Sequence, residues 1–234
     1  MTTPAALPAP RHSARLGGAT YVLASVGFLL VFAWLASHFG YPDVLDRPAS
    51  AVLPDLLALG RTGRAVWAVY ALLPLLLVPA VVAVLPALRH EARDHSAALL
   101  AVVLQVVSSL AMTLGLARWS TLQWRLAEAY RDAAGDADRA VIAATSDALN
   151  ALLGNAMGEF VGELTLFGSF AALAVLLQRR GARWLAALAW LTAVTGWVAM
   201  FRNVTPAVDA ASALPNTLLP LFLIVLGVWV IRRG

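Results

Sequence analysis

The 234-residue sequence contains no cysteine and no lysine, and only 13% of its residues are charged. The absence of cysteine excludes disulfides, thiolate catalysis and metal or cluster sites built on cysteine. All 17 basic residues are therefore arginine, and they give a net charge of +4. No basic segment has the charge density or the interleaved aromatic residues of a nucleic-acid-binding surface. We therefore expect no nucleic-acid partner.

Apolar residues are in large excess. They make up 61% of the sequence, compared with roughly 45–50% in a soluble domain. A soluble core can bury only part of such an excess, so a lipid bilayer is the expected solvent and membrane lipids are the expected partners. The chain length leaves room for several membrane spans but not for a separate soluble domain.

Six apolar segments are each close to the roughly 20 residues that cross about 30 Å of hydrocarbon at about 1.5 Å per residue. They are residues 16–37, 65–88, 97–117, 152–177, 184–201 and 214–231. The sequence predicts an all-α polytopic membrane bundle of about six transmembrane helices. We expect one domain over residues 17–234, preceded by a disordered tail over residues 1–16. Residues 51–59 predict a short helix at the membrane surface, and residues 131–151 favour an amphipathic helix.

The distribution of charge predicts the orientation. With six spans, both termini lie on the same side, which receives nine arginines and two acidic residues outside the spans. The opposite side receives eight arginines and nine acidic residues, and five of these arginines lie within the long connections or past Trp124, whereas the nine cluster at span ends. Short loops rich in arginine face the cytoplasm. We therefore expect both termini in the cytoplasm of a bacterium, with the bundle in its plasma membrane.

The fourth span carries a regular stripe of small residues. Gly154, Gly158 and Gly162 repeat every four residues, so they share one side of a helix. Small residues in this pattern let the backbone of a neighbouring helix approach closely. We interpret these three glycines as helix-packing residues.

A second stripe on the fourth span is polar. Asn155, Glu159 and Glu163 repeat at the same spacing as the glycines. A carboxylate at the centre of a span costs about 2.5–3.5 kcal/mol, so such a group must face the bundle interior, find a partner or bind a proton. Arg118, near the end of the third span, is the natural partner. Alternatively, Arg118 reaches the lipid headgroups beside an interfacial Trp119.

Other polar residues fall at the same end of the predicted bundle. We interpret Asn203, Asn216 and Thr217 as ordinary span-end residues. The expected polar cluster within the membrane, which binds a ligand or a proton or is structural, consists of Glu159, Glu163, Asn155, Arg118, His38 and Arg202.

Motifs for metal, cofactor or nucleophile chemistry are missing. The sequence has no glycine-rich phosphate loop and no nucleophile elbow. Its four histidines fall on both sides of the predicted membrane and cannot form one metal site: His12, His38, His90 and His95. We expect no cofactor and no metal.

Several short motifs occur in the order typical of one family and cover nearly the whole chain. They are Tyr41-Pro42-Asp43 with Leu45 and Pro48, Arg118-Trp119, Tyr130-Arg131-Asp132, Gly158-Glu159 and Arg183-Trp184-Leu185. On these motifs the chain resembles the bacterial multi-pass membrane family called domain of unknown function 4386. The resemblance implies a multi-pass membrane topology and supplies no activity and no site residues.

Three functions remain open. The first is a non-catalytic scaffold or small-ligand-binding membrane component with an outward-facing polar pocket, whose partner is a small molecule. The second is a proton- or cation-coupled transporter of small molecules, which acids near the membrane midplane favour. The third is an intramembrane enzyme acting on a lipid. The lack of a cysteine nucleophile, a metal set and an activated serine or histidine argues against an enzyme.

Overall fold

The structure is a computed structural model that describes residues 11–89, 91–208 and 213–233. In these ranges every regular element is helical. Six helices are long and apolar enough to cross a membrane: His12–Phe39, Gly60–Leu88, Ala92–Asp132, Asp136–Arg179, Arg183–Asn203 and Leu214–Arg233. Each predicted span falls within one of these helices and is shorter than the helix that contains it. The predicted polytopic helical bundle is therefore confirmed.

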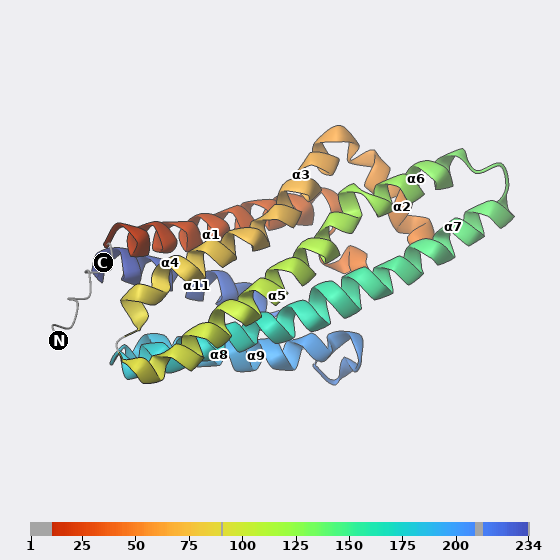
Figure 1. The fold of residues 1–234 in the computed structure, drawn as a ribbon. Helices are drawn as coiled ribbons and strands as arrows, with labels where there is room; N and C mark the ends of the chain where they lie inside the picture. The colour runs from red at the N-terminus through yellow and green to blue at the C-terminus, as the bar shows by residue number, and fades with distance from the viewer. Residues whose placement is uncertain (1–10, 90, 209–212, 234) are drawn as a thin grey trace, which may run out of the picture.

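Several of the long helices are divided into shorter elements, which Figure 1 labels where there is room. In chain order the elements are α1 (Arg11–Phe39), η1 (Asp43–Asp46), α2 (Ala49–Ala58), α3 (Gly60–Leu72), η2 (Leu73–Leu76), α4 (Leu77–Leu88), η3 (Ala92–Asp94), α5 (His95–Ser120), α6 (Leu122–Asp132), α7 (Asp136–Leu149), η4 (Asn150–Val161), α8 (Gly162–Arg179), α9 (Arg183–Ala199), η5 (Met200–Asn203), η6 (Pro206–Val208) and α11 (Leu214–Arg233).

The predicted disordered tail, residues 1–16, is wrong for residues 11–16. These residues form the first turns of α1. Ala14 is buried in the apolar core, and this packing stabilises a segment whose polar composition did not indicate a helix. Residues 1–10 lie outside the described part of the chain, so the prediction of disorder there stays a prediction.

Two apolar clusters fill the bundle. The first, which we call the termini-end core, includes Tyr21 on α1, Val84 on α4, Phe170 on α8 and Leu226 on α11. The second, the aromatic core, joins Phe39, Trp67, Tyr70, Trp119 and Trp124 with α2 at the opposite end. The rings of Trp67 and Trp119 stack with their centroids 5.0 Å apart. The bundle is thus packed by two separate cores, one at each end.

The helices α6 and α7 extend beyond the other spans as an antiparallel hairpin, far from both termini (Figure 1). The continuous helix Ala92–Asp132 has 41 residues, so it is about 60 Å long, twice the thickness of the hydrocarbon layer. Gln123 donates a hydrogen bond of 3.1 Å to the Ser146 carbonyl, and the Ser146 hydroxyl donates back to Gln123. The helix favoured within residues 131–151 is α7, and the one predicted over residues 51–59 corresponds to α2.

Prolines interrupt the second span near its middle. The chain there forms the 3₁₀ turn η2, and the hydroxyl of Ser109 on α5 donates a hydrogen bond of 2.7 Å to the Pro74 carbonyl. Neighbouring side chains commonly satisfy backbone groups that prolines free within a membrane. This contact ties α5 to the second span between the two cores.

Candidate functional site

The helix α5 lies very close to the fourth span along the glycine stripe. A Cβ atom added to Gly115 would lie 2.7 Å from the Cα atom of Gly158. A Cβ atom added to Gly162 would lie 2.8 Å from the Cγ atom of Met112. A larger residue at Gly115 would force the helices apart, because the atom that it meets belongs to the backbone, whereas the Met112 side chain opposite Gly162 can adjust.

The first half of the fourth span is not an ordinary α-helix. The segment η4 is a π-helix of 12 residues, in which each backbone N–H bonds five residues back instead of four. The angular spacing expected from a 3.6-residue period therefore does not apply over this segment. Glycine, which lacks a Cβ atom, occurs within it at Gly154 and Gly158, where α5 is closest. π-helical segments are rare and are frequent at functional sites.

The carboxylate of Glu159 is bound by the end of the fifth span. Arg202 on η5 donates hydrogen bonds of 2.8–3.0 Å to both Glu159 oxygens, in a bidentate pair. The neighbouring Asn203 side chain also donates to Glu159. The side chains of the pair are only partly exposed, 24% for Arg202 and 19% for Glu159. Charge-assisted bidentate pairs of this kind are strong and fix geometry.

Arg118 is not the partner of Glu159, contrary to the first interpretation of the sequence. The guanidinium of Arg118 donates hydrogen bonds of 3.1 and 2.8 Å to the Asn150 side-chain oxygen and a further one to the Gly115 carbonyl. It also lies over the Trp119 ring, 5.0 Å from its centroid. A Cβ atom at Gly154 would be 2.5 Å from the Arg118 Nη2 atom. Gly154, which has no Cβ atom, thus leaves room for the guanidinium to reach the Asn150 side chain.

Arg118 is buried, with 4% of its surface exposed, so it does not extend to the lipid headgroups either. Among the residues that the structure describes, no carboxylate forms a salt bridge with it. Burial of a cation is costly unless hydrogen bonds and an opposite charge compensate it. The hydrogen bonds are present here, while the opposite charge is not supplied in direct contact.

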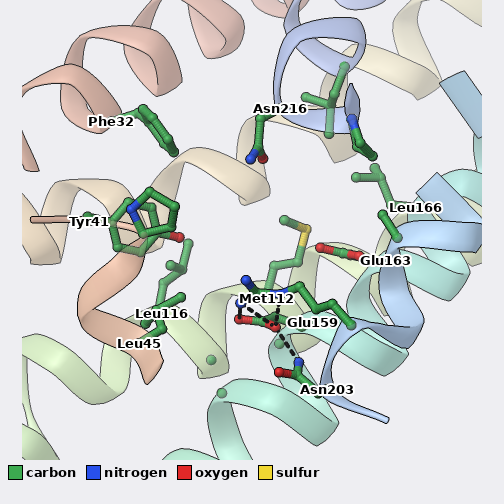
Figure 2. A pocket seen from close by; sticks show the side chains of 18 of the residues that line it. Phe32, Tyr41, Leu45, Met112, Leu116, Glu159, Glu163, Leu166, Asn203 and Asn216 are labelled. Atoms are coloured by element: carbon green, nitrogen blue, oxygen red, sulfur yellow. Dashed lines mark hydrogen bonds and ion pairs between the residues drawn. The ribbon is translucent and has the colours of Figure 1, made fainter. Parts of the chain in front are cut away.

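A cavity of about 680 Å³ lies between the two cores and collects these groups. In Figure 2 the carboxylates of Glu159 and Glu163 lie on one side of this cavity and the rings of Phe32 and Tyr41 on the other. Its lining comes from α1, η1, α3, α5, η4, α8, α9, η5 and α11, and includes Phe28, Phe32, Tyr41, Asp43, Asp46, Tyr70, Met112, Arg118, Trp119, Glu159, Glu163, Leu166, Phe167, Arg202, Asn203, Asn216 and Leu219.

Glu163 lines the cavity one helical turn beyond Glu159. No hydrogen bond or salt bridge to its carboxyl group is formed by any residue in the described ranges. The nearest part of the lining is apolar and includes Leu166 and Met112. Among the described residues, Glu163 is therefore a carboxyl group without a direct partner, and it lies one turn from Glu159, which is paired with Arg202.

Two predicted site residues lie elsewhere. His38 stacks on Trp34, with the ring centroids 4.4 Å apart, and its ring nitrogen bonds to Ser37 and to the Trp34 carbonyl. It is exposed and does not line the cavity. Asn155 is also absent from the lining. His38 is held by its own helix, and the π-helical geometry changes the direction of Asn155 relative to Glu159.

The structure adds residues that the sequence analysis did not place in the site. Asn203, interpreted as an ordinary span-end residue, binds Glu159, and Asn150 binds Arg118. Asn216 lines the cavity. Tyr41 follows α1 and also lines it, and burial raises the pKa of its hydroxyl to about 12, with a smaller contribution from the Glu159 carboxylate. For Asn203, its position next to Arg202 in the sequence is the signal that could have indicated a place in the site.

The described residues contain no group of three or more His, Asp or Glu side chains that could hold a metal ion. What the cavity offers instead is one ion pair, one buried cation, the unpaired carboxyl group of Glu163, the exposed Asp43 and Asp46, and an aromatic wall. Such a lining can bind a small molecule through charge and apolar contact.

Comparison with known proteins gives a family and no activity. No curated protein sequence and no solved structure is significantly similar to the chain. One family, described as "Domain of unknown function (DUF4386)", has a model that matches residues 16–234. The match includes all six long helices apart from the first residues of α1. The resemblance inferred from the sequence motifs is therefore confirmed, and the chain belongs to the DUF4386 family of multi-pass helical proteins.

Proposed function

We propose that the protein is a non-catalytic component of the bacterial plasma membrane that binds a small molecule in the cavity between its two cores. The observation that carries this proposal is the buried Arg118 guanidinium, which lines the cavity without a salt bridge to any described carboxylate. A purely structural arginine would be expected to pair with an acid, as Arg202 does with Glu159. A ligand that complements the cavity would compensate the burial of Arg118.

The size and lining of the cavity support ligand binding over a scaffold role. Sites for drug-sized ligands are about 300–1,000 Å³ and combine apolar walls with a few polar groups, and this cavity measures about 680 Å³. Its polar groups are also preorganised, because Asn150 and the Gly115 carbonyl hold Arg118 and Arg202 holds Glu159.

The proposed orientation places the cavity on the outer side of the membrane. The cavity lies toward the end of the bundle opposite the termini, since its lining includes Tyr41 after α1 and Asn216 at the start of α11. The arginine distribution favours cytoplasmic termini. A ligand would then enter from outside the cell or from the outer part of the bilayer.

Native mass spectrometry tests the proposed function directly. Protein purified by gentle extraction and released from nanodiscs is expected to carry a non-covalent small-molecule adduct. Asn216→Trp adds bulk at an exposed position that lines the cavity and should abolish the adduct. Thr217→Trp adds the same bulk at the next residue, which is exposed but lies outside the lining, and should retain it. Equal adducts in both variants, or none in the wild type, would contradict ligand binding at this site.

A second candidate function is proton- or cation-coupled transport, and one observation favours it. Glu163 lines the cavity without a hydrogen-bond donor among the described residues, beside the charged Glu159. A free carboxyl group inside a membrane protein is a typical proton or cation site. In proteoliposomes containing a pH-sensitive dye, Glu163→Gln should then abolish proton uptake, whereas Asp138→Asn, on the exposed part of α7, should not. Unchanged uptake in Glu163→Gln would exclude this role for Glu163.

A further inference from the structure

The hydrogen bonds of Arg118 leave part of its guanidinium free. A guanidinium has five N–H donors. The Nε atom and the Nη2 atom each donate to the Asn150 oxygen, and Nη1 donates to the Gly115 carbonyl. One N–H on each terminal nitrogen therefore has no acceptor among the residues that the structure describes. Two such donors match the two oxygens of a carboxylate.

The cavity is polar at one end and apolar at the other. Arg118 lies six residues beyond Met112 along α5, a distance of about 9 Å at about 1.5 Å per residue. Among the polar lining residues, Arg202 and Asn203 bind Glu159, whereas the lining around Met112 is apolar apart from the Glu163 carboxyl group. The apolar end is lined by Phe28, Phe32, Met112, Leu166, Phe167 and Leu219. This end is the one nearer the middle of the spans, so an apolar chain there would point into the membrane.

The charges in the lining favour a ligand with one negative charge. The charge of Arg202 is already compensated by Glu159, at 2.8 Å. Glu163 lies farther in, and Asp43 and Asp46 are exposed at the side of η1. Only Arg118 lacks a directly bound anion in the described lining, and these three acids would oppose a second negative charge on a ligand. A dianionic phosphate is therefore less suitable than a carboxylate.

From these three observations we infer that the cavity binds a carboxylic acid with a single apolar chain. The carboxylate binds the free N–H groups of Arg118, and the chain extends past Met112 toward Phe28 and Phe167. This inference rests on the proposed ligand-binding function and specifies the class of ligand. The acid can come from the bilayer as a long-chain fatty acid or from water as a short-chain organic acid, and the length of the chain distinguishes the two sources.

The test measures binding of three probes with the same chain to the full-length protein in nanodiscs of uncharged lipid. Dodecanoate, dodecanol and dodecyltrimethylammonium differ only in the head group, and empty nanodiscs supply the baseline. Dodecanoate is labelled isotopically at its carboxyl carbon, so that NMR reports the environment of the head group. We expect saturable binding of dodecanoate with a shifted carboxyl resonance, and weaker binding of the alcohol and the cation by roughly 10- to 100-fold.

Variants locate the head group. Arg118→Gln should weaken dodecanoate binding by roughly 10- to 100-fold and leave dodecanol binding unchanged, since it removes a charge-assisted hydrogen bond. Arg125→Gln removes an exposed arginine from α6, outside the lining, and should bind dodecanoate as the wild type does. Should Arg118→Gln fail to fold, Gly154→Ala is the second variant, because its Cβ atom would displace the Arg118 guanidinium.

Each outcome decides the inference. Equal affinity for dodecanoate and dodecanol, or equal dodecanoate affinity in the Arg118→Gln variant, would overturn the carboxylate anchor while leaving ligand binding in place. Hexanoate binding as tightly as dodecanoate would overturn the requirement for a chain and assign a water-soluble acid. Absence of dodecanoate binding would also overturn the inference, and the adduct seen by mass spectrometry separately decides the proposed function. Weak hexanoate binding with strong dodecanoate binding supports a fatty acid from the bilayer.

Discussion

The two ends of the bundle differ in how their helices are packed. At the end with the termini, helices meet mainly through aliphatic side chains, with a few aromatic rings such as Phe170 and Phe222 and a direct contact between Gly18 and Gly227, and the core is continuous from α1 to α11. At the other end, aromatic rings surround a cavity that contains the paired Glu159 and Arg202 and the buried Arg118. The charged groups deep in this bundle therefore lie beside a cavity that can admit water or a ligand, because burying a charge in lipid is costly.

The comparison also separates stability from function. A tightly packed half can hold the helices together, so the other half can retain unused space and uncompensated charge. Sites that bind ligands often give up stability for such features. Substitutions in the two halves should therefore differ in how much they lower the free energy of unfolding, with the largest loss in the half that contains the termini.

The largest effect is expected where α1 meets α11. A Cβ atom on Gly18 would lie 2.6 Å from the Gly227 carbonyl oxygen, a backbone atom that cannot move aside. Gly18→Leu should therefore lower the free energy of unfolding by about 3 kcal/mol, the upper part of the usual range for overpacking. Titration with a denaturing detergent in mixed micelles measures this change.

The next residue provides the control for that variant. Ala19 is exposed on α1, so Ala19→Leu adds similar bulk without a close neighbour and should change the free energy of unfolding by less than about 0.5 kcal/mol. Similar stability for the two variants would mean that the contact between Gly18 and Gly227 does not stabilise the half of the bundle that contains the termini.

A smaller effect is expected from the ion pair in the cavity. Glu159→Gln and Arg202→Gln should each lower the free energy of unfolding by about 2 kcal/mol, because each removes charge-assisted hydrogen bonds and leaves the other charge partly buried. The double variant should lose less than the sum, with a coupling energy of roughly 1–3 kcal/mol in a double-mutant cycle.

The same cycle with Arg118→Gln sharpens the assignment. Arg118 forms its direct hydrogen bonds with Asn150 and the Gly115 carbonyl instead of Glu159, so its coupling to Glu159→Gln should be smaller than that of Arg202. A larger coupling for Arg118 than for Arg202 would restore the pairing first inferred from the sequence and contradict the observed geometry.

The sequence predicted the spans because hydrophobic length alone determines which segments can cross a bilayer. It also indicated that Glu159 and Glu163 would need an inward-facing environment, since the energetic cost applies to any carboxylate in lipid. Both residues line the cavity. These inferences needed only composition and spacing along one helix.

The partners within the site could not be predicted in the same way. Pairing of Glu159 with Arg202 depends on how the fifth span packs against the fourth, which no local pattern encodes. The π-helical segment η4 changes which residues share a side, so the period assumed for Asn155 did not apply. The role of Asn150 in holding Arg118 also arises from a contact between residues 32 positions apart.

The smallest effect is expected between the two halves, where α5 meets the proline-interrupted span. The Ser109 hydroxyl donates to the Pro74 carbonyl at 2.7 Å, whereas the Ser108 hydroxyl, equally buried, donates only to the Met112 sulfur at 3.6 Å. The Ser109 hydroxyl also accepts a hydrogen bond of 3.3 Å from the Gln105 side chain. Side-chain hydrogen bonds within membranes are worth about 0.6 kcal/mol on average, so Ser109→Ala, which removes both bonds, should lower the free energy of unfolding by about 1.2 kcal/mol. Ser108→Ala should lower it less, because a thioether is a weak acceptor. Detergent titration compares the unfolding free energies of the two variants directly. An equal loss in both variants would mean that the Pro74 contact does not link the half that contains the termini to the half that contains the cavity.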